Sequence, residues 1–184
     1  MLAKYKYLLT YRYSLAIHDL TVEFTFKFMP GFDYRRSREQ MVQAARSGKQ
    51  NIVEGVGQSL ISKKGEIKLL GVANASLEEL LSDYEDFLRQ HSLGIWLKSD
   101  KRITSFREYA FKITNINNLN KNGEFIEKPV LPKTSEEAAN FLLTLCHQAT
   151  FLLSRQIAKM EELFIKEGGY SENLFKKRLN SKIK

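Results

Sequence analysis

Cysteine, proline and long apolar runs are scarce in this chain of 184 residues. Its one cysteine, Cys146, excludes an intramolecular disulfide and any zinc site built from several cysteines, and fits a reducing compartment. The three prolines, Pro30, Pro129 and Pro132, leave long proline-free segments, which favour helices. The longest stretch without a charged residue, 138–154, is too short and too polar to span a membrane.

What is present favours a soluble, basic protein of one domain. Hydrophobic residues make up 43% of the chain, which is enough for a core and argues against wholesale disorder. Lys and Arg outnumber Asp and Glu by 29 to 21, which gives a formal net charge of +8. The N-terminal sequence has no apolar run followed by a small-residue cleavage site, so we expect no signal peptide and a cytoplasmic location. Composition alone does not indicate a function.

The first segment, about residues 10–29, carries two conflicting patterns. Residues 21–28 alternate polar and apolar side chains, which is typical of a strand. Read as a helix, the same segment has one apolar stripe for a core and a second stripe nearly opposite, so a partner chain would have to cover the second. That second stripe consists of Leu15, Val22, Phe26 and Met29. The local pattern favours helix and strand about equally for residues 21–28.

Two further segments have clear helical spacing. Residues 34–58 place small side chains on one face, which lets a neighbouring helix approach closely. That face consists of Met41, Ala45, Gly48, Ile52 and Gly55. Residues 62–91 form the clearest amphipathic helix, with an acidic face that contains Glu79, Asp83 and Asp86.

The second half begins with an insertion, about residues 94–133, in which 100–116 could form a further helix. The next long helix starts at Thr134, which has Glu137 at the spacing of a capping box, and stops at Gly168. These patterns predict an all-α antiparallel bundle of four helices spanning residues 1–169. The basic tail, 170–184, is expected to be loosely ordered.

The sequence offers no positive sign of catalysis. None of the three histidines, His18, His91 and His147, follows a glutamate by three positions, so the pattern of di-metal bundles is absent. His147 and Cys146 are adjacent on a helix and do not face each other. Gly55 and Gly57 begin like a dinucleotide fingerprint, but the third glycine and the preceding strand are missing. We therefore expect no enzyme, no metal and no cofactor.

The basic residues are segregated along the chain. Residues 1–13, 35–49 and 170–184 carry net charges of +3, +4 and +4, which leaves −3 for the rest. If the middle segment is a helix, four of its cations project within about 80° of one another around the helix axis and form a ridge roughly 20 Å long. They are Arg35, Arg38, Arg46 and Lys49. The candidates for contacts with RNA or DNA phosphates are Arg35, Arg36, Arg38, Arg46 and Lys49. The competing interpretation is a solvated face that pairs with the acidic stripe of 62–91.

Two stretches carry a family resemblance. Residues 40–55, QMVQAARSGKQNIVEG, and residues 76–88, SLEELLSDYEDFL, resemble the bacterial four helix bundle protein family. That family includes the protein encoded in ribosomal-RNA intervening sequences and the accessory variability protein of diversity-generating retroelements. The chain is most similar to the variant with a four helix bundle suffix region. The resemblance covers about 9–93 and, more loosely, 134–167.

The resemblance implies an up-down-up-down four-helix bundle, a helical first segment and no catalytic residue. It also implies a homopentamer, in agreement with the two-sided first helix. A relative binds nucleic acid and a reverse transcriptase through a basic surface, so both are candidate partners. The positions that match the family signature are Asn51, Glu54 and Gly55. Gly55 is expected to end its helix, and the two polar side chains to cap or bridge to neighbouring helices.

Two functions compete on this basis. The first is a non-enzymatic, homo-oligomeric accessory protein that binds RNA or DNA. The second is a protein-interaction scaffold in which ion pairs between subunits occupy the basic stripe. No membrane partner is expected in either case.

Overall fold

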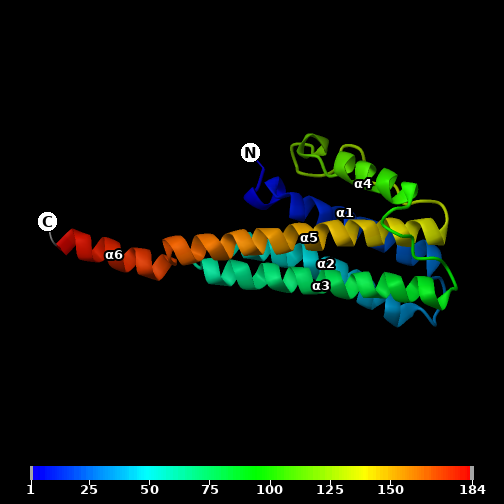
Figure 1. Cartoon of the computed structure of the whole chain (residues 1–184), viewed down its shortest axis with the longest axis horizontal. Helices are drawn as coiled ribbons and strands as arrows, with labels where there is room; N and C mark the ends of the chain where they lie inside the picture. The colour runs from blue at the N-terminus through cyan, green and yellow to red at the C-terminus, as the bar shows by residue number, and fades with distance from the viewer. Residues whose placement is uncertain (1, 183–184) are drawn as a thin grey trace.

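The computed structural model describes residues 2–182, without the side chains of Ser171 and Lys182, and all its longer elements are helices (Figure 1). The α-helices are α1 (Leu9–Phe28), α2 (Arg35–Gln58), α3 (Lys63–Gln90), α4 (Lys101–Ile113), α5 (Ser135–Glu167) and α6 (Tyr170–Lys182). Two short 3-10 helices are η1 (Lys4–Tyr7) and η2 (Ile116–Asn118). The expectation of an all-α protein is confirmed for the described part of the chain.

The strand alternative for residues 21–28 is wrong, because this segment lies within α1. The threonines that create the alternation are buried, yet their hydroxyls find acceptors inside the helix. Thr21 Oγ1 donates to the carbonyl of Ile17 at 2.6 Å, and Thr25 Oγ1 to that of Val22 at 3.1 Å. Tyr84 of α3 adds a hydrogen bond to Thr21 Oγ1 at 2.8 Å. These bonds satisfy polar groups that would be costly to bury otherwise.

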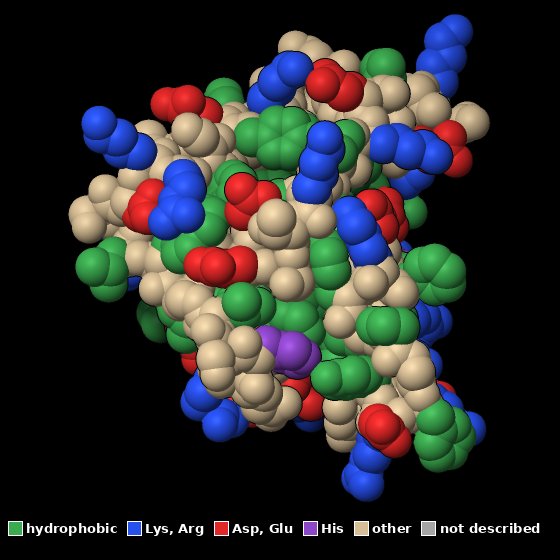
Figure 2. Space-filling model, turned by 90° about the vertical axis from the view of Figure 1, so that its right-hand side faces the viewer, with side chains coloured by type: hydrophobic (Ala, Val, Ile, Leu, Met, Phe, Trp, Pro, Cys, Tyr) green, Lys and Arg blue, Asp and Glu red, His purple; other side chains and the backbone are tan. Residues whose placement is uncertain are grey.

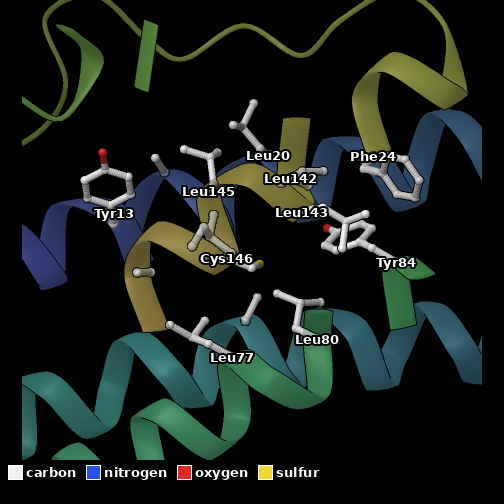
Figure 3. Close-up of a cluster of buried hydrophobic side chains, with 14 of the residues drawn as sticks. Tyr13, Leu20, Phe24, Leu77, Leu80, Tyr84, Leu142, Leu143, Leu145 and Cys146 are labelled. Carbon is white, nitrogen blue, oxygen red and sulfur yellow. The ribbon is translucent and has the colours of Figure 1, made fainter. Parts of the chain in front are cut away.

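Four long helices enclose the core. α1 packs against α2 and α5, and α3 also packs against α2 and α5, while α4 lies outside against α5 (Figure 1). Side chains from α1, α3 and α5 point toward one another in the centre (Figure 3). The fully buried ones include Leu20, Leu77, Tyr84, Leu142 and Cys146. Their burial removes apolar surface from water, which is the main stabilising term of such a fold.

Glycines set the spacing between α2 and α3. A Cβ atom at Gly48 would lie 2.8 Å from Leu77 Cδ2, and one at Gly55 would lie 3.4 Å from the carbonyl oxygen of Glu66. The predicted close approach along the small-residue face is therefore confirmed. The expectation that Gly55 ends its helix is wrong, because α2 continues to Gln58. Gly55 instead lies inside α2 at the contact with α3, where a Cβ atom would be within ordinary van der Waals distance of its neighbours.

The insertion is anchored on α5 by one aromatic residue. Trp96 donates from its backbone N–H to Asn140 Oδ1 and from its indole Nε1 to Glu136 Oε1, both at 2.8 Å. Its ring stacks on Phe106 of α4, which in turn contacts Phe141 of α5. The predicted helix near 100–116 is present as α4.

The ends of α5 agree with the sequence. Thr134 Oγ1 accepts the backbone N–H of Glu137 at 3.3 Å, and the helix stops before Gly168, whose φ is +75°. Beyond it, Tyr170–Lys182 form α6, where the sequence favours a loosely ordered tail. The last basic residue of that tail, Lys184, lies outside the described residues. No helix within residues 2–182 is long and apolar enough to cross a membrane.

Replacing two glycines of α2 tests the close packing. Gly48→Ala is expected to lower the free energy of unfolding by about 1–2 kcal/mol, because overpacking against buried Leu77 exceeds the gain in helix propensity. Gly57→Ala is the matched control, since nothing lies within 4 Å of its Cβ. It should stabilise the protein by up to about 1 kcal/mol. Urea denaturation measures both changes, and equal effects would contradict close packing at Gly48.

Candidate nucleic-acid interface on α2

Three of the five predicted phosphate-binding residues are exposed on α2: Arg35, Arg36 and Arg46. Arg35 forms an exposed ion pair with Glu39 one helical turn away, at 3.3 Å, and its guanidinium lies over the ring of Phe32. Such exposed pairs contribute little to stability and are easily exchanged for another anion. These arginines are therefore available to a ligand.

Arg38 is already engaged in hydrogen bonds within the chain. Its Nη1 donates to the carbonyl oxygens of Met29 and Gly31, at 2.5 and 2.8 Å, and the residue is only partly exposed. Both carbonyls belong to the connection between α1 and α2. Arg38 therefore closes this turn, which differs from the free phosphate contact that its helical spacing predicts.

Lys49 is also partly buried. Its Nζ lies 3.2 Å from Nδ1 of His18 on α1. Burial lowers the pKa of Lys49, the nearby Asp19 carboxylate opposes that shift, and Arg46 adds to it. The five-residue ridge predicted from spacing thus divides into three exposed arginines and two cations that face other parts of the chain.

The surroundings of the exposed arginines are mixed in charge. Figure 2 shows the end of the molecule at which α2 begins, where Lys and Arg side chains stand among carboxylates and exposed apolar side chains. A shallow groove runs between α2 and α3 from this end, and its lining includes Arg36, Ser47, Ser76 and Glu79. The positive charge is therefore local to α2 rather than spread over a whole face.

The acidic face of α3 does not neutralise these arginines. Among the described residues, no arginine of α2 forms an ion pair with Glu79, Asp83 or Asp86. Burial first, and then the like charges of Glu79 and Asp86, raise the pKa of Asp83 to about 6. Its Oδ2 atom is buried without a hydrogen-bond partner. The pairing with the acidic stripe that the solvated-face interpretation requires is thus absent among the described residues of this chain.

The predicted oligomer stripe on α1 is only partly exposed. Phe26 is 86% and Val22 44% exposed, while Leu15 is partly buried against the core. The placement of Met29 on this outer stripe is wrong, because it is only 4% exposed and belongs to the core of the chain itself. Met29 follows the last residue of α1 and leaves the helical conformation, with φ −124° and ψ 53°. The helical spacing that predicts an outward direction therefore no longer applies to it.

The family-signature residues lie near the contact between α2 and α3. Asn51 Nδ2 donates to Ser47 Oγ at 3.2 Å and to the Ser47 carbonyl at 2.9 Å, and Ser47 Oγ lies 2.9 Å from Ser76 Oγ on α3. Asn51 therefore belongs to a polar bridge between the two helices. Glu54 is exposed and forms no side-chain hydrogen bond with any described residue. Gly55 is buried at the same contact, as described above.

The N-terminal basic segment is partly structural as well. Arg12 is buried, and its guanidinium donates to the carbonyl of Thr114 at 2.6 Å and to that of Tyr7 at 2.7 Å. The Lys6 amine donates to the carbonyl of Asn122. Lys6 and Arg12 therefore hold the insertion against η1 and α1. The net charge of the segment does not reveal this role.

Other chemistry-bearing groups do not assemble into a reactive site. Cys146 is fully buried, and burial raises the pKa of its thiol. Within residues 2–182, no three His, Cys, Asp or Glu side chains come close enough to share a metal ion. The structure does bring together Lys98, Arg107 and His147, which the sequence analysis does not connect. They come from three separate segments, so no sequence spacing relates them.

Comparison with known proteins gives no relative for this chain. No protein-family model, no curated protein and no solved structure matches it. The resemblance carried by residues 40–55 and 76–88 therefore stays a prediction.

The contrast between Arg38 and Arg46 is testable by stability measurements. Arg38→Gln should lower the free energy of unfolding by about 1–3 kcal/mol, because two charge-assisted hydrogen bonds to the α1–α2 turn are lost. Arg46→Gln is the control on the same helix and should change it by less than about 0.5 kcal/mol. Thermal and urea unfolding measure both. An Arg38→Gln protein as stable as the parent would contradict the structural role of Arg38.

Proposed function

We propose that this chain is a non-enzymatic accessory protein that binds RNA or DNA and works as a homo-oligomer. The observation that carries the proposal is the set of exposed arginines on α2, namely Arg35, Arg36 and Arg46. None of the three is paired with the acidic face of α3 in the described subunit. Arginine suits phosphate because its planar guanidinium donates two parallel hydrogen bonds.

The proposed architecture is an antiparallel up-down-up-down four-helix bundle made of α1, α2, α3 and α5. Its support is that each of these helices packs against two of the others in a closed cycle. Short connections of residues 29–34 and 59–62 join α1 to α2 and α2 to α3, as expected for antiparallel neighbours. The 94–133 insertion, with α4, then joins α3 to α5.

The spacing of the arginines supports a nucleic-acid ligand. Arg35 and Arg46 are 11 positions apart on one helix, which is about 16 Å along its axis. A nucleic-acid strand presents several phosphates over such a length. Because the contacts are to phosphates, binding should depend little on sequence and steeply on salt.

The exposed apolar side chains of α1 support self-association. Val22 and Phe26 are one helical turn apart and both face outward, with Phe26 86% exposed. A second copy that covered them would remove this surface from water. The family resemblance implies a pentamer and a protein partner such as a reverse transcriptase, and the lack of a signal-peptide pattern favours a cytoplasmic location.

One observation favours the alternative function, a protein-interaction scaffold. Asp83 keeps a buried carboxylate oxygen without a partner, between two further carboxylates of α3. A cation from another subunit would stabilise the charged Asp83 carboxylate and so lower the free-energy cost of burying it. In that case the exposed arginines would be used between subunits and not by a nucleic acid.

A charge-removal experiment tests nucleic-acid binding. The triple variant Arg35→Gln, Arg36→Gln, Arg46→Gln should weaken binding to duplex DNA or structured RNA at least tenfold at about 50 mM salt. It should also make the slope of log binding constant against log salt concentration less steep by up to about 3. Each lost phosphate contact contributes close to one unit to this slope. The control is Lys121→Gln, Lys133→Gln, Lys159→Gln, which has the same net charge and alters only exposed lysines. Fluorescence anisotropy at several salt concentrations measures all three proteins.

Two outcomes of this titration would reject the nucleic-acid function. One is no binding of the parent protein to either ligand at low salt. The other is equal weakening by both triple variants, since only general charge would then matter. Loss of self-association in the arginine variant, without any binding by the parent, would support the scaffold instead.

The oligomer is tested by Phe26→Ser combined with Val22→Ser. The parent should elute as a multimer in size-exclusion chromatography with light scattering, and the variant should have a lower mass with unchanged helical circular dichroism. Ile126→Ser is the control, because Ile126 is also exposed but lies in the insertion. A parent protein that is strictly monomeric at high concentration would reject the homo-oligomer.

A further inference from the structure

A groove lies between the insertion and α5, apart from the arginines of α2. It has a volume of about 500 Å³, which is within the range of small-molecule pockets. Its walls come from residues 95–98, from α4 and from one face of α5. Its apolar lining includes Ile103 and Leu143, which are nearly buried, and Leu97 and Phe151, which are exposed.

The polar lining of the groove is positively charged. Its charge comes from Lys98 and Arg107, which line it together with His147, and no Asp or Glu does so. Neither Lys98 nor Arg107 forms an ion pair with a described residue. Burial lowers the pKa of His147, and the charges of Lys98 and Arg107 lower it further against the opposing Glu85. Lys98 and Arg107 line the same groove, so an anion bound in it would be attracted to both.

Trp96 is a fixed part of the wall. Its ring stacks on Phe106 with 5.7 Å between centroids, and the guanidinium of Arg102 lies 3.4 Å from its centroid. Its indole N–H is satisfied by Glu136. Because these contacts already engage the ring, the groove favours an apolar body over a stacked nucleobase.

We propose that this groove binds a small amphipathic anion, namely an organic carboxylate with an apolar chain. The carboxylate lies at the rim formed by Lys98, Arg107 and His147. The chain lies against Ile103 and Leu143, and Phe151 borders the opening. The charge of the lining selects an anion, and its mainly apolar floor selects a hydrocarbon body. This site is independent of the nucleic-acid function proposed above.

The only tryptophan of the chain lines the groove, so its fluorescence reports binding directly. Titration with hexanoate and octanoate, below their micellar concentrations, should change the emission of Trp96, and calorimetry measures the same affinities. Octanoate should bind more tightly, by about threefold or more for each additional buried methylene. Octan-1-ol and octyltrimethylammonium, which lack the negative charge, should bind at least tenfold more weakly.

Variants of the rim separate this site from nonspecific binding. Arg107→Gln and Lys98→Gln should each weaken octanoate binding several-fold, and the double variant more. Lys159→Gln is the matched control, since it removes an exposed cation of α5 outside the groove lining. Its affinity for octanoate should equal that of the parent.

Three results would overturn the proposal. The first is no heat and no fluorescence change with octanoate at millimolar concentration. The second is equal affinity for octanoate and its neutral or cationic analogues, or for the rim variants and Lys159→Gln. The third is binding of uridine monophosphate without binding of octanoate, which would assign the groove to a nucleotide. None of these results depends on whether the arginines of α2 bind nucleic acid.

Discussion

A Cβ atom at Gly48 would lie 2.8 Å from the side chain of Leu77, so any larger residue at this position would force Leu77 or the α2–α3 contact to shift. Gly55 lies two turns later in the same contact, as does the Ser47–Ser76 hydrogen bond. This approach fixes which side of α2 is buried and therefore which of its arginines reach solvent. The arrangement of charge on the surface is in this sense a consequence of core packing.

Arginine has two roles in this chain. Arg12 and Arg38 direct their guanidinium groups at backbone carbonyls, where they join segments that no helix connects. Arg35, Arg36 and Arg46 are exposed and form at most a weak surface pair. Burial and hydrogen bonding separate the two groups, although the residue type is the same and Arg38 lies on the same helix as the exposed arginines. The proposed nucleic-acid surface therefore rests on three arginines and not on the total positive charge.

The insertion does more than connect α3 to α5. Trp96 attaches it to α5 through two hydrogen bonds and an aromatic stack, and the resulting groove collects Lys98, Arg107 and His147. The bundle and the insertion thus present two separate positively charged sites. One is a convex row of arginines on a helix, which suits a polymer of phosphates. The other is a concave apolar site, which suits a single small anion.

The sequence by itself determined the helical segments that have strong periodicity, the start of α5 at Thr134 and its stop at Gly168, and the small-residue face of α2. Those features depend on neighbours within one or two turns of the chain. Only the tertiary structure decided between helix and strand for residues 21–28, where Thr21 is buried and accepts a hydrogen bond from Tyr84 of α3. It also decided that Met29 is buried, that Gly55 lies inside α2, and that Arg38 closes a turn. Each of these outcomes depends either on atoms from distant segments that the fold brings together or on a change in backbone direction. The spacing of residues along the sequence specifies neither.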